Sequence, residues 1–440
     1  MSSLKSIFFI ILVISSAFSA LGPNDINIPS DYVSDSSFIS MIFKEPKAIN
    51  TLYASPSGSG SKCSESSPCS LQTALDNLEK GSTLYLKGGT YNVKSGVSIE
   101  ASGSSNSYIL ISSAPDEKAI ITSTSTDSVG LFEIYGSYII IENLTFQKVE
   151  AKNVQGIVFY GGGQHHVIIR NNNFDSLKTT KIDPEYGANG ILLMGEEEEG
   201  IKQIIIYGNT LTNNVLGYSE ALSVAGNCEE IYVLNNNLNS NTNIGIDFYG
   251  NAKYCRKPEL DQPRKSVAMY NNVEKSVSPY ADCAGLYIDG ARDIYVAENT
   301  ISNSQYGIEI GSEEKNDKYP VKNIIVKKNE LNDNTITGLR IGGFDEKDTG
   351  VVRDCEFVEN VISGSHTAVI ISKAESIVFN DNQFLDNDKY FIDMEFSSSY
   401  TKDIEIENNV FSGAGKFRLY GSTKLSLDEF LEKYLSNSKK

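Results

Sequence analysis

Short apolar segments alternate with turns rich in Gly and Asn along most of this chain. β-Branched runs such as Ile139-Ile140-Ile141 and Ile204-Ile205-Ile206 are typical of buried strands. A second kind of segment has the form Gly-apolar-x-apolar, as in Gly307-Ile308-Glu309-Ile310. Because successive side chains of a strand point to opposite faces, we expect the apolar pair inside and x outside. From about Tyr108 onward, the pattern predicts strand, turn, strand, turn.

An asparagine follows most of the apolar strands, at steps of 22 to 37 residues. A period in this range predicts a solenoid, in which each repeat buries its apolar face against its neighbours. Asn suits such turns because it tolerates the left-handed region and bonds its own backbone, and stacked Asn side chains can form ladders. We therefore interpret the repeat as architecture. The equivalent positions are Asn172, Asn209, Asn236, Asn272, Asn299, Asn329, Asn360, Asn382 and Asn409.

Helices are predicted at both ends of the solenoid, where a terminal coil would otherwise expose its core. Residues 70–78 place Leu71, Ala74, Leu75 and Leu78 at helical spacing, and a strand follows at 82–86. Ser426 and Glu429 form a capping box before an apolar stripe. The predicted fold is all-β: a single-stranded right-handed parallel β-helix of about ten coils, with an N-terminal helical cap and a C-terminal capping helix.

The first residues have the pattern of a secretory signal peptide. Lys5 precedes an apolar run at 7–14, and Ala17 and Ser19 are small residues at the −3 and −1 positions of a cleavage site. The run is too short to span a membrane, although an uncleaved anchor is the alternative. We assign 1–19 to the signal peptide, 20–50 to an arm or linker, and 51–440 to the β-helix domain, with caps at 51–107 and 425–436. The mature protein is expected to be secreted, extracellular and monomeric.

Secretion makes the six cysteines candidates for disulfides. Cys63 and Cys69 surround a short Ser/Pro loop, which favours a local bridge. Cys255 and Cys283 flank a long insertion at 251–280, and a bridge there would hold it. The sequence does not fix the pairing of the remaining two, Cys228 and Cys355. Asn143 begins a glycosylation sequon.

The net charge of −18 restricts the partners. It argues against nucleic acid and against an anionic membrane surface. It also disfavours long polyanionic substrates, unless calcium or a local patch of Arg and Lys intervenes. Trp is absent whereas Tyr numbers 24, so any stacking on sugar rings falls to tyrosine.

The outward x positions change character in the middle coils. Aligned coil by coil, they are Val158, Leu192, Ser223, Asp247, Tyr287, Glu309 and Arg340. The next outward positions are Tyr160, Met194, Ala225, Tyr249, Asp289, Gly311 and Gly342. Acids, a cation and aromatic rings thus follow neutral residues, which predicts a groove floor with a candidate active site. A solvated face of an acidic protein is the plainer alternative.

Asp247 and Glu309 are two coils apart, which is about 9.6 Å between backbones. Carboxyl groups at this kind of separation suit an inverting glycosidase, and a crowded acid has a raised pKa that suits a proton donor. The same three carboxylates, Asp247, Asp289 and Glu309, are also hard oxygen donors that could bind calcium. Glu220 lies either at the strand edge beside Asp247 or in the interior.

Several segments resemble secreted right-handed β-helix proteins of the pectate-lyase-like superfamily. The cap resembles theirs in Tyr53-Ala54-Ser55-Pro56-Ser57-Gly58, Pro68-Cys69-Ser70-Leu71-Gln72-Thr73-Ala74-Leu75 and Gly88-Gly89-Thr90-Tyr91. The strands resemble theirs at 243–248, 285–290 and 307–313. The resemblance implies the β-helix fold and an acid-lined groove. Some pectate lyases use a lysine base beside aspartate-bound calcium, whereas the similar position here is Ala225.

Our first hypothesis is a secreted glycoside hydrolase acting on a polysaccharide. Glu309 and Asp289 would form the acid/base pair, with Asp247 positioning water or serving as the second carboxylate. The substrate-binding residues would be Glu220, Tyr249, Tyr287 and Arg340, with the tyrosines stacking on sugar rings. No cofactor is required, although calcium is possible. The alternatives are a calcium-assisted polysaccharide lyase and a non-catalytic glycan-binding or wall protein.

Overall fold

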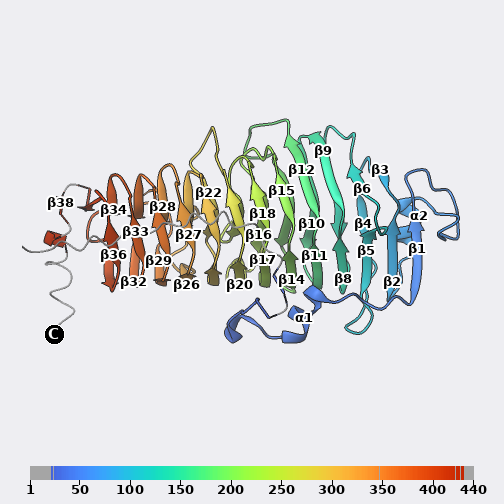
Figure 1. Ribbon diagram of the computed structural model, residues 1–440, viewed down its shortest axis with the longest axis horizontal. Helices are drawn as coiled ribbons and strands as arrows, with labels where there is room; N and C mark the ends of the chain where they lie inside the picture. The colour runs from blue at the N-terminus through green and yellow to red at the C-terminus, as the bar shows by residue number, and fades with distance from the viewer. Residues whose placement is uncertain (1–20, 23, 346, 422, 427, 431–440) are drawn as a thin grey trace, which may run out of the picture.

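The computed structural model of the protein describes residues 21–430, except 23, 346, 422 and 427. These residues form an elongated solenoid of three sheets (Figure 1), with 13, 13 and 12 strands. Neighbouring strands within each sheet come from successive coils and pair in parallel, except β37 and β38 at the end, which pair antiparallel. The prediction of an all-β solenoid is confirmed.

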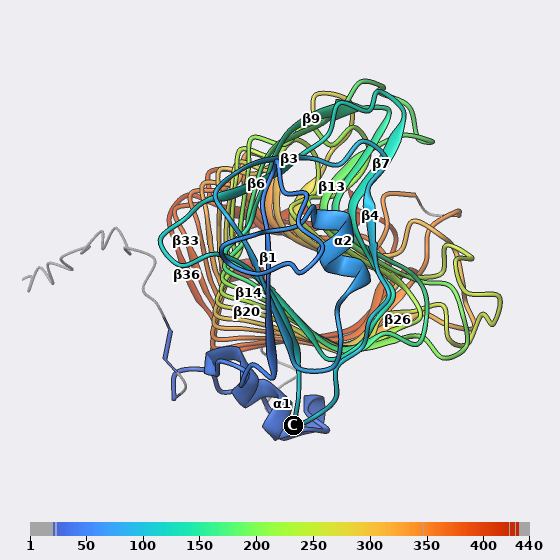
Figure 2. The same ribbon diagram turned by 90° about the vertical axis from the view of Figure 1, so that its right-hand side faces the viewer.

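The first sheet forms the face against which the N-terminal arm packs (Figure 2). Its strands are β1 (Asn50–Ala54), β2 (Ser82–Leu86), β5 (Ile109–Ser113), β8 (Ile139–Glu142), β11 (His165–Arg170), β14 (Ile201–Tyr207), β17 (Cys228–Leu234), β20 (Arg264–Met269), β23 (Arg292–Ala297), β26 (Val321–Lys327), β29 (Val352–Val358), β32 (Ala374–Asn380) and β35 (Thr401–Glu407).

The second sheet contains the Gly-apolar-x-apolar segments and therefore the candidate site. Its strands are β4 (Val97–Ile99), β7 (Ser128–Ile134), β10 (Asn153–Gly161), β13 (Ala188–Gly195), β16 (Leu222–Gly226), β19 (Ile246–Tyr249), β22 (Ala284–Asp289), β25 (Tyr306–Gly311), β28 (Thr337–Ile341), β31 (Thr367–Ile371), β34 (Tyr390–Met394), β37 (Lys416–Leu419) and β38 (Thr423–Leu425).

The third sheet contains mostly short strands that follow the Asn turns. They are β3 (Gly89–Asn92), β6 (Ala119–Thr122), β9 (Thr145–Ala151), β12 (Asn173–Thr179), β15 (Thr210–Thr212), β18 (Asn237–Asn239), β21 (Asn272–Glu274), β24 (Thr300–Ser302), β27 (Glu330–Asn332), β30 (Val361–Ser363), β33 (Gln383–Leu385) and β36 (Val410–Ser412). Inward side chains of all three sheets form one apolar core along the whole solenoid.

The repeated asparagines form a continuous buried ladder. In each step, the backbone N–H and the Nδ2 of one Asn donate to Oδ1 of the next, as from Asn209 to Asn236 at 3.0 Å each. The ladder runs through Asn172, Asn209, Asn236, Asn271, Asn299, Asn329, Asn360, Asn382 and Asn409. One predicted member was wrong: the ladder uses Asn271, whereas Asn272 belongs to β21 and pairs with Asn237.

The left-handed turn position also differs from the prediction. The residue with positive φ is the one before the ladder asparagine, as at Asn171, Asn235 and Asn408. Non-glycine residues other than Asn occupy it too, such as Glu298 and Lys328. The ladder asparagine is retained for its side-chain amide, which donates and accepts at once, rather than for its backbone freedom.

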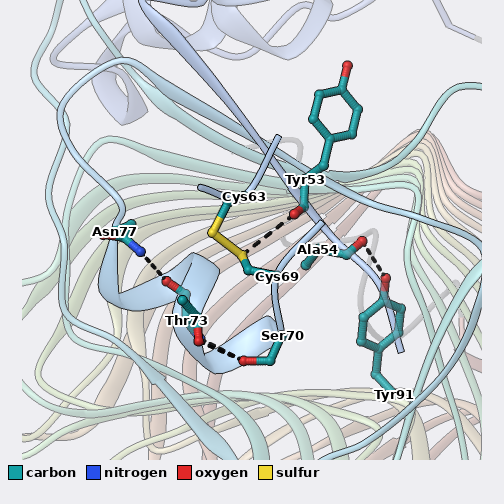
Figure 3. Close-up of a disulfide and its surroundings, with 8 residues drawn as sticks. All are labelled: Tyr53, Ala54, Cys63, Cys69, Ser70, Thr73, Asn77 and Tyr91. Carbon is teal, nitrogen blue, oxygen red and sulfur yellow. Dashed lines mark hydrogen bonds between the residues drawn. A yellow bond between two sulfur atoms is a disulfide. The ribbon is translucent and has the colours of Figure 1, made fainter. Parts of the chain in front are cut away.

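The N-terminal cap closes the first coil. Helix α2 (Leu71–Asp76) is capped by Ser70, whose hydroxyl accepts from the backbone N–H of Thr73, and it buries Leu71, Ala74 and Leu75. A disulfide joins Cys63 to Cys69 beside this helix (Figure 3), as predicted. At the other end, Ser426 and Glu429 form the predicted capping box, and Phe430 is buried in the core. The remainder of the predicted helix at 425–436 lies outside the described residues, as does the signal peptide at 1–19.

The N-terminal arm packs against the first sheet. It contains η1 (Ser30–Tyr32), α1 (Ser36–Ser40) and η2 (Met41–Phe43), and its apolar side chains cover an outward stripe that includes Ile168 and Ile205. The buried Arg170 guanidinium anchors the arm by donating to three backbone carbonyls of residues 41, 42 and 44. The strands of the first sheet that the arm covers, such as β11 and β14, are therefore apolar on both faces. Among the described residues, no helix is long and apolar enough to cross a membrane.

The insertion predicted at 251–280 was too long, because β20 and β21 lie within it. The extra chain is two loops, 250–263 and 275–283, on either side of these strands. The predicted bridge between Cys255 and Cys283 was wrong, since both are free buried thiols. They lie on different loops with different neighbours: Glu197 is near Cys255, whereas Ser276 and Gln305 contact Cys283. Cys228 and Cys355 are also free and buried.

Candidate functional site

The outward column of the second sheet has the predicted register. Val158 pairs with Leu192, and the column continues through Ser223, Asp247, Tyr287, Glu309 and Arg340. The flanking apolar residues lie in the core, as the alternation requires. Each strand therefore places its x side chain on the same outer face, next to the corresponding side chain of the next coil.

An open groove of about 420 Å³ lies on this face, over β13, β16, β19 and β22. The loops 250–263 and 275–283 supply part of its walls. Its acidic lining residues are Glu220, Asp247, Asp282, Asp289 and Glu313. Its aromatic lining residues are Tyr218, Tyr249 and Tyr254. The groove thus joins four predicted site residues: Glu220, Asp247, Tyr249 and Asp289.

Asp247 is the most unusual of the groove carboxyls. Its side chain is 2 % exposed, and its buried Oδ1 has no hydrogen-bond partner among the described residues. Burial raises its pKa well above the usual range, and the nearby Glu220 and Asp289 raise it further. Because no donor within the described residues reaches its Oδ1, the environment favours the neutral form of Asp247.

Asp289, in the next coil, is also buried, but it has a donor. The backbone N–H of Glu313 donates to its Oδ1 at 2.9 Å. Burial and the Glu313 carboxylate raise the pKa of Asp289 well above its usual range, whereas that N–H acts to lower it. The two aspartates therefore share a crowded site but differ in the support that each ionised form receives.

Glu220 precedes β16 and faces the groove rather than the interior. Burial raises its pKa to about 7, against the lowering effect of hydrogen bonds that include the side chains of Ser223 and Asn189. The Asn189 side chain also donates to the backbone carbonyl of Glu220 at 2.7 Å, which holds the turn in place. Of the two positions considered for Glu220, the structure has the one beside Asp247.

Glu309, Arg340 and Tyr287 lie beside the groove but do not line it. Glu309 is 6 % exposed and lies 3.5 Å from the Arg340 guanidinium, which also contacts Glu395 at 3.4 Å. Burial raises the pKa of Glu309 to about 8, although Arg340 acts to lower it. Tyr287 is 4 % exposed and packs against Ala284 and Tyr306 in a small apolar cluster. Neither Tyr287 nor Arg340 is placed to contact a ligand in the groove.

Four of the acidic and aromatic lining residues were not among the predicted site residues: Tyr218, Tyr254, Asp282 and Glu313. Tyr254 lies on the loop 250–263, where no strand periodicity indicates direction; its ring meets that of Tyr249 edge-on, 5.7 Å between centroids. Asp282 lies on the second loop and accepts from the Tyr306 hydroxyl at 2.9 Å. Glu313 is exposed at the rim, two residues beyond the end of β25. The only sequence signal for the loops was the longer spacing between repeats.

Calcium binding by Asp247, Asp289 and Glu309 stays a prediction. Within the residues that the structure describes, no group of three or more His, Cys, Asp or Glu side chains is arranged to hold a metal ion. The Asn143 side chain is exposed, and its glycosylation stays a prediction.

Two family models of right-handed β-helix regions match the chain. One, for Pel9A-like right-handed β-helix regions, matches residues 52–194, and one for right-handed β-helix regions in general matches residues 264–428. The predicted resemblance to right-handed parallel β-helix proteins of the pectate-lyase-like superfamily is confirmed. A relative from Bacillus subtilis (strain 168), the uncharacterized protein YwoF, is 30% identical over 317 residues. That alignment covers 68% of this chain and 65% of the relative, so the chain spans less than two thirds of it.

Solved structures with the same fold have different activities. The A-module of mannuronan C-5 epimerase AlgE4 from Azotobacter vinelandii has a TM-score of 0.51 at 12% identity, covering 78% of this chain and 90% of that one. A GH136 lacto-N-biosidase from Eubacterium ramulus has 0.51 at 11%, covering 84% and 68%. The adhesin PfbA of Streptococcus pneumoniae has 0.51 at 14%, covering 79% and 94%. These likenesses establish the fold alone, and function must be argued from the groove.

Proposed function

We propose that this protein is a secreted carbohydrate-active enzyme that hydrolyses glycosidic bonds in the groove of the second sheet. The observation that carries the proposal is that Glu220, Asp247 and Asp289 line one open groove, each with a raised pKa. Glycoside hydrolysis needs two carboxyl groups in different protonation states. Burial and mutual repulsion in this groove supply that difference.

Hydrogen bonding assigns the two roles. Asp247 has no donor for its Oδ1 and is the general acid, because its neutral form is favoured. Asp289 accepts from the backbone N–H of Glu313 and is the base, because that bond favours its ionised form. Glu220 borders both and adjusts the proton balance of the cluster, since its pKa is about 7.

In the proposed step, Asp247 gives its proton to the glycosidic oxygen, and the bond from that oxygen to the anomeric carbon breaks. A water molecule attacks the anomeric carbon and gives a proton to Asp289. One water is consumed, two sugar hydroxyl groups are formed, and the proton returns from Asp289 to Asp247 through the open groove. Tyr249 and Tyr254 provide aromatic surface for the sugar rings at the groove wall.

This assignment changes the partner first proposed for Asp289. Glu309 faces Arg340 rather than the groove, so Asp247 replaces Glu309 in the acid/base pair with Asp289. Glu309 and Arg340 become positioning residues. They stabilise the coil that contains β25, whose Gly311 pairs with Asp289. Arg340 forms ion pairs with Glu309 at 3.5 Å and Glu395 at 3.4 Å and does not line the groove.

The test is product formation from a panel of neutral and acidic polysaccharides by the secreted protein. We expect new reducing ends from at least one of them, at a rate that Asp247→Asn and Asp289→Asn each lower by about 10²–10⁴-fold. Asp403→Asn is the matched control, because this exposed acid lies on β35 of the first sheet. Recovery of the protein from the medium without residues 1–19 would test the proposed secretion.

Two outcomes would favour other functions. Products that absorb as unsaturated sugars, formed only with calcium and lost with chelator, would favour the lyase alternative. Glycan binding without any products, unchanged in Asp247→Asn, would favour a non-catalytic binding protein of the kind that the adhesin represents. Reducing ends formed by both aspartate variants as fast as by the parent would contradict the proposed roles.

A further inference from the structure

The groove has an extreme charge composition. Five of its lining residues are acids, and among the described lining residues none is Lys, Arg or His. The charged groups that act most strongly on Asp247 are Glu220, Asp289, Glu313 and Glu309, which are all acids. Five of the 56 Asp and Glu residues of the chain therefore share one groove that no lining cation neutralises.

Three cations on elements next to the groove have other partners. Arg340, three coils from Asp247 in the column, contacts Glu309 and Glu395 and lies over the Tyr306 ring. On the other side, Arg264 pairs with Glu229 and donates to Asn227. The Lys257 ammonium, on the loop that forms a groove wall, pairs with Glu198. None of these three lines the groove.

A ligand with carboxylate or sulfate groups would meet like charge from the groove acids that are ionised, among them the proposed base Asp289. Repulsion between like charges is strong where water is partly excluded, and it is a common device for rejecting a ligand class. The groove lacks the Arg or Lys patch that the acidic composition of the chain would require for a polyanionic substrate.

The hydrogen-bonding groups of the groove favour ligands that donate hydrogen bonds. The buried Oδ1 of Asp247 is an acceptor without a donor among the described residues. Ionised carboxylates accept and do not donate, whereas sugar hydroxyl and amino groups donate. A ligand rich in hydroxyl or ammonium donors would complete the hydrogen bonds of the Asp247 Oδ1, whereas the carboxylate or sulfate group of an acidic glycan adds only acceptors.

We infer that the groove selects glycans whose units are neutral or carry amino groups, and rejects polyuronates and sulfated glycans. This inference rests on the proposed function, because it names the ligand class of the same groove. It separates this protein from a polyuronate-acting enzyme despite the Pel9A-like region at 52–194.

The test is binding to length-matched oligosaccharides of glucose, glucosamine, galacturonic acid and sulfated galactose, with turnover measured in the same samples. We expect the glucose or glucosamine series to bind at least about tenfold more tightly than either acidic series. Added salt should weaken binding of glucosamine and strengthen any residual binding of the acidic glycans, since it screens attraction and repulsion alike.

A variant with one added cation tests the selectivity of the groove without reference to the absolute affinity of the parent protein. Met194 lines the groove beside Ala225, and Met194→Lys adds one cation there with little change in length. We expect this variant to reduce the ratio of the affinity for glucose oligosaccharides to that for galacturonic acid oligosaccharides several-fold. The control Gln383→Lys adds the same charge at an exposed position of β33 and should leave the preference unchanged.

The outcomes separate this inference from the proposed function. Preferred binding and cleavage of an acidic glycan would overturn the inference and leave the hydrolase proposal standing. Binding of neutral or amino glycans without cleavage would support the ligand class and overturn hydrolysis. No binding to any of the four series would overturn both.

Discussion

Two rows of buried polar side chains run through this solenoid, and they differ in whether their hydrogen bonds are complete. In the asparagine ladder, each buried amide both donates and accepts, as Asn236 does between Asn209 and Asn271. In the groove, Asp247 is equally buried, yet its Oδ1 has no partner among the described residues.

The difference teaches which buried polar groups are structural. A buried polar group costs stability unless it is hydrogen-bonded, so a complete ladder contributes to folding. An incomplete row of acids lowers stability, and such a cost persists where a site is prepared for a ligand. The ladder continues through the middle coils, so the same coils contain both rows.

The largest expected contrast is in Asp247→Asn. We expect activity to fall by about 10²–10⁴-fold, because the amide cannot donate the proton of an acid. At pH 8 the free energy of unfolding should rise by about 1 kcal/mol, because the folded parent keeps a proton on Asp247 that the unfolded chain has lost, whereas the amide titrates in neither state. Turnover assays and urea unfolding of the same preparation measure both effects.

Opposite signs for activity and stability are the distinguishing result. A variant that lost activity and stability together would mean that Asp247 is a structural residue, like the ladder asparagines. Asp403→Asn, at an exposed position, should change neither quantity.

The next effect concerns the ladder itself and separates two adjacent asparagines. Asn271→Ala removes the acceptor of Asn236 and the donor to Val233 and Asn299, so we expect a loss of about 3–5 kcal/mol in unfolding free energy. Asn272→Ala removes a half-buried contact to Asn237 and should cost about 1 kcal/mol or less. Equal costs in urea unfolding would show that the ladder is not what stabilises these coils.

This pair also shows the limit of sequence reasoning about the fold. The Gly-apolar-x-apolar segments fixed the sheet and its outward column correctly, because strand alternation is a strict geometric rule. Asn271 and Asn272 are chemically identical neighbours, however, and only the left-handed turn at Tyr270 selects the first. The bridge between Cys255 and Cys283 failed because loop paths have no such periodicity.

The candidate site was predictable to a similar depth. Alternation placed Asp247, Glu309 and Arg340 on one face, which is where they lie. It could not tell which outward side chains the loops leave open to a ligand. Glu309 lies outside the groove and forms an ion pair with Arg340, its partner on the neighbouring strand β28. Tyr254 was missed because the position of its loop depends on tertiary contacts, such as Asp261 accepting from the backbone N–H groups of residues 253 and 255.

A smaller effect should appear in the pH dependence of stability. The pKa of Glu220 is about 7 in the folded protein, against an ordinary value of 4.5. The folded state therefore keeps a proton that the unfolded state has lost, so stability falls as pH rises from about 4.5 to about 7. Glu220→Gln should reduce this pH-dependent loss of unfolding free energy by roughly 1–3 kcal/mol.

Unfolding curves of the parent and of Glu220→Gln at pH 5 and pH 8 measure this difference. The variant should gain stability relative to the parent only at the higher pH. A parallel shift at both values would mean that Glu220 titrates normally and that the groove does not perturb it.

The smallest expected effect is at the groove wall, where aromatic surface replaces charge. Tyr254 lines the groove edge-on to Tyr249, whereas Tyr287 is buried beside it. Tyr254→Ala should raise KM by about 5–30-fold with kcat nearly unchanged, because stacking on a sugar ring is retained from the bound substrate to the transition state. Tyr287→Phe keeps the buried ring and should leave KM unchanged. If Tyr287→Phe raised KM as much as Tyr254→Ala, the substrate would extend along the column toward Glu309, and the binding site would include the coil that contains Glu309.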